Sequence, residues 1–152
     1  MRKCTLKVAK TSRVRPVVPK DQKECLVTYV KVNGQDAWTL WDSGSTTTGI
    51  TPAFHQYLAN IPVFALEDPH ILQLGTTGSR ANVNYGLYTQ IETQGTTTRE
   101  YLDVANFDRY DMIVGTPYMY RNKVKLDFEK KCVVVNGVSV PATPVIMNDT
   151  DG

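Results

Sequence analysis

Residues 38–47 read WTLWDSGSTT, an apolar, strand-like run that ends in an aspartate. Burying an unpaired carboxylate is costly, so such a group is normally neutralised, paired or used in chemistry. Ser43 and Gly44 follow Asp42 and favour a tight turn. The stretch therefore predicts a carboxylate held on a turn at the edge of a cleft, although an Asp-Ser-Gly triplet alone is more often a plain turn than a catalytic one.

The segments around this run read as strands joined by tight turns. They are rich in Val, Thr and Tyr, as strands prefer, and Asn-Gly is a favoured two-residue hairpin turn. Three hairpins are predicted, with turns at Asn33-Gly34, Gln94-Gly95 and Asn136-Gly137.

Helical signals are few. Thr51-Pro52 supplies an N-cap and a first helical residue for a helix over residues 53–60, and Thr116-Pro117 does the same for a short turn over residues 118–122. Because strands and helices do not alternate, a parallel α/β fold is disfavoured. The sequence predicts an all-β fold, mostly antiparallel, with one or two short helices.

The composition is that of an ordinary globular protein with one core. The chain has 152 residues, of which 41% are hydrophobic and 21% charged. No apolar run is long enough to span a membrane, and the N-terminus lacks a signal-peptide core, so a cytoplasmic location or a virus-like particle is expected. Cys4, Cys25 and Cys132 lack metal-like spacing; reduced thiols are expected, with a Cys25–Cys132 disulfide as the minor alternative.

The charge divides the chain into an arm, a domain and a tail. Residues 1–23 carry eight Lys or Arg residues and one Asp. A solvated, extended linker is preferred over a contact with nucleic acid or an acidic partner, because no aromatic residues interleave these charges. The folded domain is expected over residues 24–141, and a flexible tail over residues 142–152.

Metal, cofactor and serine-hydrolase chemistry find no support in the sequence. His55 and His70 lack nearby Cys, Asp or Glu residues at ligand spacing, so no metal site is expected. Residues 74–80, LGTTGSR, lack the Gly-Lys-Ser/Thr ending of a phosphate loop, and no Gly-x-Ser-x-Gly elbow occurs. We expect no cofactor.

Three motifs together resemble the retropepsins, the aspartic proteases of retroviruses and LTR retrotransposons, with the gypsy-like branch and its domesticated relatives nearest. Leu40-Trp41-Asp42-Ser43-Gly44 matches the family's hydrophobic-hydrophobic-Asp-Thr/Ser-Gly motif, and Ile113-Val114-Gly115 matches its late motif before a helix. A looser match is the flap hairpin. Its expected tip residues are Leu74, Gly75, Thr76, Thr77 and Gly78.

The resemblance implies a closed antiparallel β-barrel that acts as a symmetric homodimer. One chain carries a single Asp-Ser-Gly motif, whereas the chemistry needs two carboxylates sharing one proton. Asp42 and its symmetry mate would activate a water that cleaves a polyprotein substrate. Ser43 would lock the two turns together, Gly44 would allow close backbone approach, and Gly115 would pack beneath the loop.

The sequence departs from the family pattern at a few positions and leaves two other functions open. Ser45 and Thr46 stand where retroviral enzymes usually have Ala and often Asp, and the segment after Phe128 is longer than theirs. One alternative is a retropepsin-fold module that dimerises and binds peptide with weak or no proteolysis. The other is a β domain that binds nucleic acid through the basic arm. Trp38 and Trp41 are expected to fill core or interface space rather than to bind ligand.

Overall fold

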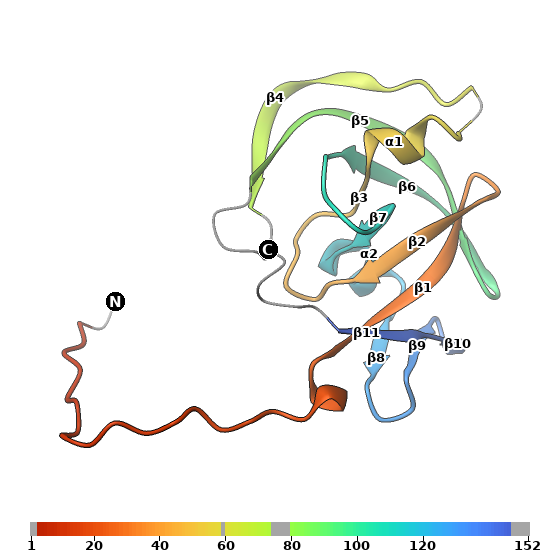
Figure 1. Cartoon of the computed structure of the whole chain (residues 1–152). Coiled ribbons are helices and arrows are strands. Elements are labelled where there is room, and N and C mark those ends of the chain that lie inside the picture. Colours follow the sequence, from red (N-terminus) through yellow and green to blue (C-terminus); the bar gives the residue numbers. More distant parts are fainter. Residues whose placement is uncertain (1–2, 59, 74–79, 147–152) are drawn as a thin grey trace.

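Three tight turns organise the strands of the computed structural model, which describes residues 3–58, 60–73 and 80–146 (Figure 1). Asn33 and Gly34 have φ angles of 47° and 82°, and Asn136 and Gly137 have 48° and 82°. Two successive positive φ angles are typical of a type I′ hairpin turn, which asparagine and glycine tolerate best. Gly95 also has a positive φ, 80°. All three predicted hairpins are confirmed.

Eleven strands and two short α-helices are found within the described residues, together with one 3-10 turn, η1. The all-β fold class with short helices is therefore confirmed. The elements are η1 Lys20–Gln22, β1 Glu24–Val32, β2 Gln35–Trp41, β3 Gly49–Ile50, α1 Pro52–His55, β4 Phe64–Gln73, β5 Arg80–Thr93, β6 Thr96–Val104, β7 Met112–Val114, α2 Thr116–Arg121, β8 Lys125–Asp127, β9 Cys132–Val135, β10 Val138–Pro141 and β11 Thr143–Ile146.

Eight strands form one sheet in the order β11-β1-β2-β7-β3-β6-β5-β4. An additional pairing joins β1 to β5, so the six strands from β1 to β5 in this order follow one another in a ring of pairings (Figure 1). Most pairings are antiparallel, but β2 with β7 and β3 with β6 are parallel. Strand β7 thus lies between β2 and β3, the two strands that flank the Asp42 turn.

A smaller sheet, in the order β10-β9-β8, follows α2. The chain then returns to the large sheet, because β11 pairs with the start of β1. The sequence predicts a flexible tail over residues 142–152, whereas the structure places Thr143–Ile146 in this edge strand. Val145 lies opposite Cys25 and packs against an apolar cluster, which accounts for the ordered pairing.

The two helices begin at different kinds of cap. Thr51 caps α1 as predicted, since its Oγ1 accepts a hydrogen bond from the Phe54 amide at 3.1 Å. The prediction that Thr116 caps α2 is wrong. Gly115 is the N-cap and makes no side-chain capping bond, so Thr116 is already the first helical residue and Pro117 the second.

The core contains two apolar clusters. Trp41 belongs to the larger one and is 4% exposed, and its indole Nε1 donates to Thr28 Oγ1 at 2.8 Å. Trp38 is half-buried beside Tyr29, with ring centroids 4.8 Å apart. Both tryptophans thus pack against other residues of the chain, as expected. The smaller cluster, called the second cluster here, has as its buried members Val27, Leu40, Val83, Ala105, Phe107 and Tyr110.

The basic arm is extended and exposed. It runs away from the two sheets toward the N-terminus (Figure 1), and its apolar side chains Leu6, Val8, Val14 and Val17 are all more than four-fifths exposed. Cys25 and Cys132 are both free thiols, so the alternative disulfide is not formed. Within the part of the chain that the structure describes, no helix has the length and apolar character to cross a membrane.

Candidate active site

Asp42 lies directly after β2, where parallel β7 supports it. Its amide donates to the Val114 carbonyl at 2.9 Å and so extends the β2–β7 pairing by one residue. Within the turn, the Gly44 amide donates to Asp42 Oδ1 at 2.9 Å, and the Ser45 amide donates to the Asp42 carbonyl at 3.1 Å. The half-buried carboxylate is therefore held in one orientation by its own turn.

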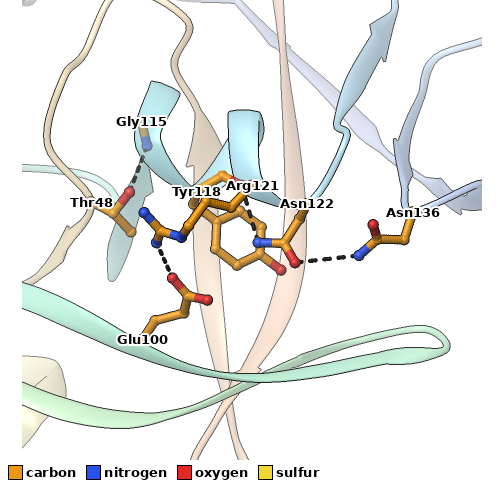
Figure 2. Close-up of polar contacts among 7 residues, drawn as sticks. All are labelled: Thr48, Glu100, Gly115, Tyr118, Arg121, Asn122 and Asn136. Carbon is orange, nitrogen blue, oxygen red and sulfur yellow. Dashed lines mark hydrogen bonds and ion pairs between the residues drawn. The ribbon is translucent and has the colours of Figure 1, made fainter.

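Residues 45–48 close the turn into a rigid loop. Ser45 Oγ donates to the Thr47 carbonyl at 2.9 Å and accepts from the Thr47 amide at 3.1 Å. Thr48 Oγ1 accepts from the Gly115 amide at 3.0 Å (Figure 2), and the Ser45 carbonyl accepts from the Thr116 amide at 2.8 Å. Two backbone donors at the start of α2 therefore hold the loop that follows Asp42.

Gly115 lies against this loop too closely for any side chain. A Cβ atom at this position would lie 2.4 Å from the Thr47 carbonyl oxygen and 2.6 Å from that of Ser45. Both distances are far shorter than a van der Waals contact. The two oxygens belong to the backbone, so they cannot shift without moving the loop. Glycine here is thus required by the contact between the end of β7 and the loop of residues 45–48.

The second cluster includes residues of the strands that lead to the Asp42 turn. Leu40 and Ile113 are paired across β2 and β7, each two residues before Asp42 and Gly115 respectively, and both belong to this cluster. Cys25 is another member; burial raises the pKa of its thiol, and the negative charge of Asp42 raises it further. The cluster therefore contains a thiol, that of Cys25, which lies close enough to Asp42 to be affected by its charge.

Tyr110 and Asp111 contribute to the same region and had no distinctive sequence signal. Burial raises the pKa of the Tyr110 phenol, and the neighbouring Cys25 adds to the rise. Asp111 fixes the start of β7, since its Oδ2 accepts from the Trp38 amide at 2.8 Å and its own amide donates to the Trp38 carbonyl at 2.8 Å. Because Asp111 lies 73 residues after Trp38, local sequence patterns could not have predicted this contact.

The structure places most of the expected site residues together. Asp42, Ser43 and Gly44 form the turn, and Ile113, Val114 and Gly115 run beside and beneath it. The expected flap residues Leu74, Gly75, Thr76, Thr77 and Gly78 lie outside the described residues. The strands that lead to them, β4 and β5, pair as an antiparallel hairpin.

Neither histidine joins a metal-like cluster. His55 Nε2 lies 2.7 Å from the Ile61 carbonyl, and His70 Nε2 lies 3.7 Å from Asp103 Oδ2. Tyr101 OH donates to the other carboxylate oxygen of Asp103 at 2.6 Å. Among the residues that the structure describes, no three His, Cys, Asp or Glu side chains are grouped closely enough to hold a metal ion.

A family model described as retroviral aspartyl protease matches residues 9–139. The chain belongs to the retroviral aspartyl protease family. The resemblance inferred from the three motifs is thereby confirmed, and the match covers most of the chain. No curated protein matches it in sequence.

Two solved structures share the fold of this aspartyl protease domain. The retroviral protease-like domain of Ddi1 from Leishmania major has 14% sequence identity and a TM-score of 0.61, covering 84% of this chain and 97% of that one. EIAV protease, solved with the inhibitor HBY-793, has 19% identity and a TM-score of 0.54, covering 72% of this chain and 99% of that one. At these identities the likeness concerns the fold alone.

Proposed function

We propose that this chain is an aspartic endopeptidase of the retroviral and retrotransposon type, which cleaves polyprotein peptide bonds as a homodimer. The observation that carries the proposal is the Asp42 carboxylate, oriented by the Gly44 amide on a loop that Gly115 and Thr116 hold from below. A pure binding module has no need for a carboxylate fixed in this way. The family membership supports the same reaction class.

Two chains are needed because each carries one Asp-Ser-Gly motif. Peptide hydrolysis by aspartic proteases uses two carboxyl groups that share one proton, since two like charges about 3 Å apart cannot both ionise. A two-fold axis beside Asp42 would supply the second group from an identical turn. Ser43 would join the two turns by hydroxyl-to-backbone hydrogen bonds across the axis.

The proposed reaction needs no covalent intermediate. The ionised carboxylate takes a proton from a water as that water attacks the peptide carbonyl, and the protonated carboxyl donates to the developing oxyanion. The proton taken from the water then passes to the leaving nitrogen as the C–N bond breaks, and the gem-diol returns a proton to the other carboxylate as the product carboxyl group forms. The second cluster would supply apolar contacts for the substrate, which would bind as an extended strand beneath the hairpin of β4 and β5.

A cleavage assay with an unbiased peptide library tests the proposal. Wild type and Asp42→Asn are compared from about pH 4 to 7, with their oligomeric state measured by sedimentation. We expect wild-type dimers to cleave and Asp42→Asn dimers to bind the same peptides without cleaving them. Cleavage that persists in Asp42→Asn contradicts the mechanism.

Two other outcomes favour the competing functions. If wild-type dimers bind peptides and cleave none of them, the chain is a peptide-binding module of the same fold. If the chain binds single-stranded nucleic acid with strong salt dependence, and loses that binding when residues 1–23 are deleted, the basic arm carries the main function instead.

A further inference from the structure

The short helix α2 supports the active-site loop and depends on anchors of its own. Its N-terminal residues donate two backbone hydrogen bonds to the loop, from Gly115 to Thr48 and from Thr116 to Ser45. A helix of six residues has too few internal hydrogen bonds to persist alone, so tertiary contacts must set its position. Where the far end of α2 is fixed therefore matters for the loop at its near end.

A buried carboxylate anchors that far end. Glu100 lies on β6 and is 6% exposed, and Arg121, the last residue of α2, donates from Nη2 to its Oε1 (Figure 2). The Arg121 side chain is 57% exposed, but removing it leaves the buried Glu100 carboxylate without its cation, which costs more than losing a pair in which both groups are exposed. Glu100 consequently favours the one placement of α2 that brings Arg121 to it.

Tyr118 connects this anchor with the strand that carries Asp42. Its side chain is 1% exposed and packs edge-on against Trp41, with ring centroids 6.0 Å apart. Burial raises the pKa of Tyr118 to about 12, and the nearby charge of Glu100 adds to the rise. Contacts thus run from β6 through α2 to the residue immediately before Asp42.

We propose that Glu100 and Arg121 are positioning residues for the active-site turn. Their ion pair fixes α2 on β6, and α2 in turn holds the Gly115 and Thr116 amides against the loop of residues 45–48. Neither side chain contacts Asp42, so their effect is on the placement of the loop. The kinetic consequence rests on the proposed proteolytic function, whereas the placement of the loop does not.

Amide hydrogen exchange tests the placement without any need for activity. In full-length Arg121→Gln we expect exchange at Gly115 and Thr116 to accelerate roughly tenfold or more, while the paired core amides of Leu87 and Leu102 stay within about twofold of wild type. The matched control is Lys31→Gln, which breaks an exposed ion pair with Asp36 far along the sequence from α2 and should leave all these amides unchanged. Unchanged protection at Gly115 and Thr116, or a uniform acceleration at every amide, overturns the inference.

A conservative variant covers the case in which Arg121→Gln does not fold. Arg121→Lys keeps the positive charge and loses the guanidinium fork, so it should show a smaller but still selective acceleration at Gly115 and Thr116. A uniform change, or none, again overturns the inference.

Cleavage kinetics add a second readout. In folded, dimeric Arg121→Gln, kcat should fall roughly tenfold or more while KM stays within about twofold, because the loop carries the reacting carboxylate rather than the apolar contacts for the substrate. Arg121→Lys should recover part of the loss. An unchanged kcat overturns the inference. If wild type cleaves nothing, the proposed function has failed. The hydrogen-exchange experiment still tests whether Glu100 and Arg121 position the loop.

Discussion

The two ends of strand β2 carry the same residue type in opposite settings. Asp36 lies near its start, where the Asn33-Gly34 turn faces solvent; its side chain is 59% exposed and pairs with Lys31 at 3.1 Å. Asp42 follows its end, where the carboxylate accepts an amide hydrogen bond from Gly44 and lies within electrostatic range of the partly buried Cys25. One aspartate is solvated and paired with a cation, and the other is oriented by backbone near a partly buried thiol.

The turns next to the two aspartates differ in the same way. The Asn33-Gly34 turn has open space around it, since a Cβ atom on Gly34 would meet nothing within 4 Å. The Asp42 turn is held by hydrogen bonds from β7 and α2, and Gly115 beneath it has no room for a Cβ atom. The difference indicates that the second turn is built to hold a carboxylate still, whereas the first only reverses the chain.

Replacing each aspartate by asparagine should give the largest contrast. We expect Asp42→Asn to lower kcat for peptide cleavage by roughly 10²-fold to 10⁴-fold or more, since it removes the group that moves the proton. Asp36→Asn loses only an exposed ion pair, so kcat should stay within about twofold and stability within about 1 kcal/mol. Steady-state kinetics and thermal melts of both variants measure this. Equal losses of kcat in the two variants would contradict the view that only the aspartate at the end of β2 takes part in catalysis.

Glycine substitutions should give a smaller contrast, in stability. Gly115→Ala forces a Cβ atom against the Thr47 and Ser45 carbonyl oxygens and should lower the free energy of unfolding by about 1–3 kcal/mol. Gly34→Asn keeps a residue that tolerates positive φ in an open turn, so its cost should stay below about 1 kcal/mol. Urea unfolding of the two variants provides the test. A Gly115→Ala protein as stable as wild type would mean that the loop is loosely held.

Local patterns predicted those parts of the molecule that local chemistry determines. The Asn-Gly turns, the Thr51 cap and the Asp42-Ser43-Gly44 turn each depend on a few adjacent residues. The family resemblance predicted that Gly115 packs beneath the loop after Asp42, as the structure has it. Local sequence patterns could not have predicted this contact, because the two segments are about seventy residues apart.

Contacts between distant segments were not predictable in the same way. β11 pairs with the start of β1, and Arg121 pairs with Glu100, because the fold brings these segments together rather than because either carries a sequence signal. The expected Thr116 cap failed for a related reason: the Thr116 amide is engaged by the Ser45 carbonyl, more than seventy residues earlier in the chain. Intrinsic propensity limits the conformations that a short segment can adopt, and tertiary contacts determine which of them it adopts.

The smallest expected effect concerns the rates at which two cysteines, Cys25 near Asp42 and the exposed Cys4, react with a thiol reagent. Burial and the charge of Asp42 raise the pKa of Cys25, so at a fixed pH near 8 its reactive thiolate fraction is small and a maleimide reagent should label it more slowly than exposed Cys4. Asp42→Asn removes the charge contribution, lowers the pKa of Cys25 and should accelerate its labelling, with Cys4 unaffected. Mass spectrometry of the labelled peptides follows both sites. An unchanged labelling rate at Cys25 would show that the charge of Asp42 does not influence this thiol.

The central claim is that each chain holds half of an active site, and subunit mixing tests it most directly. Wild type and Asp42→Asn are equilibrated in equal amounts, so that chains exchange at random, and cleavage is compared with wild type alone at the same total concentration. Because only dimers with two aspartates are active, we predict that activity falls to about one quarter. Activity that falls only to about one half, in proportion to the wild-type chains present, would show that a single chain suffices and would contradict the account.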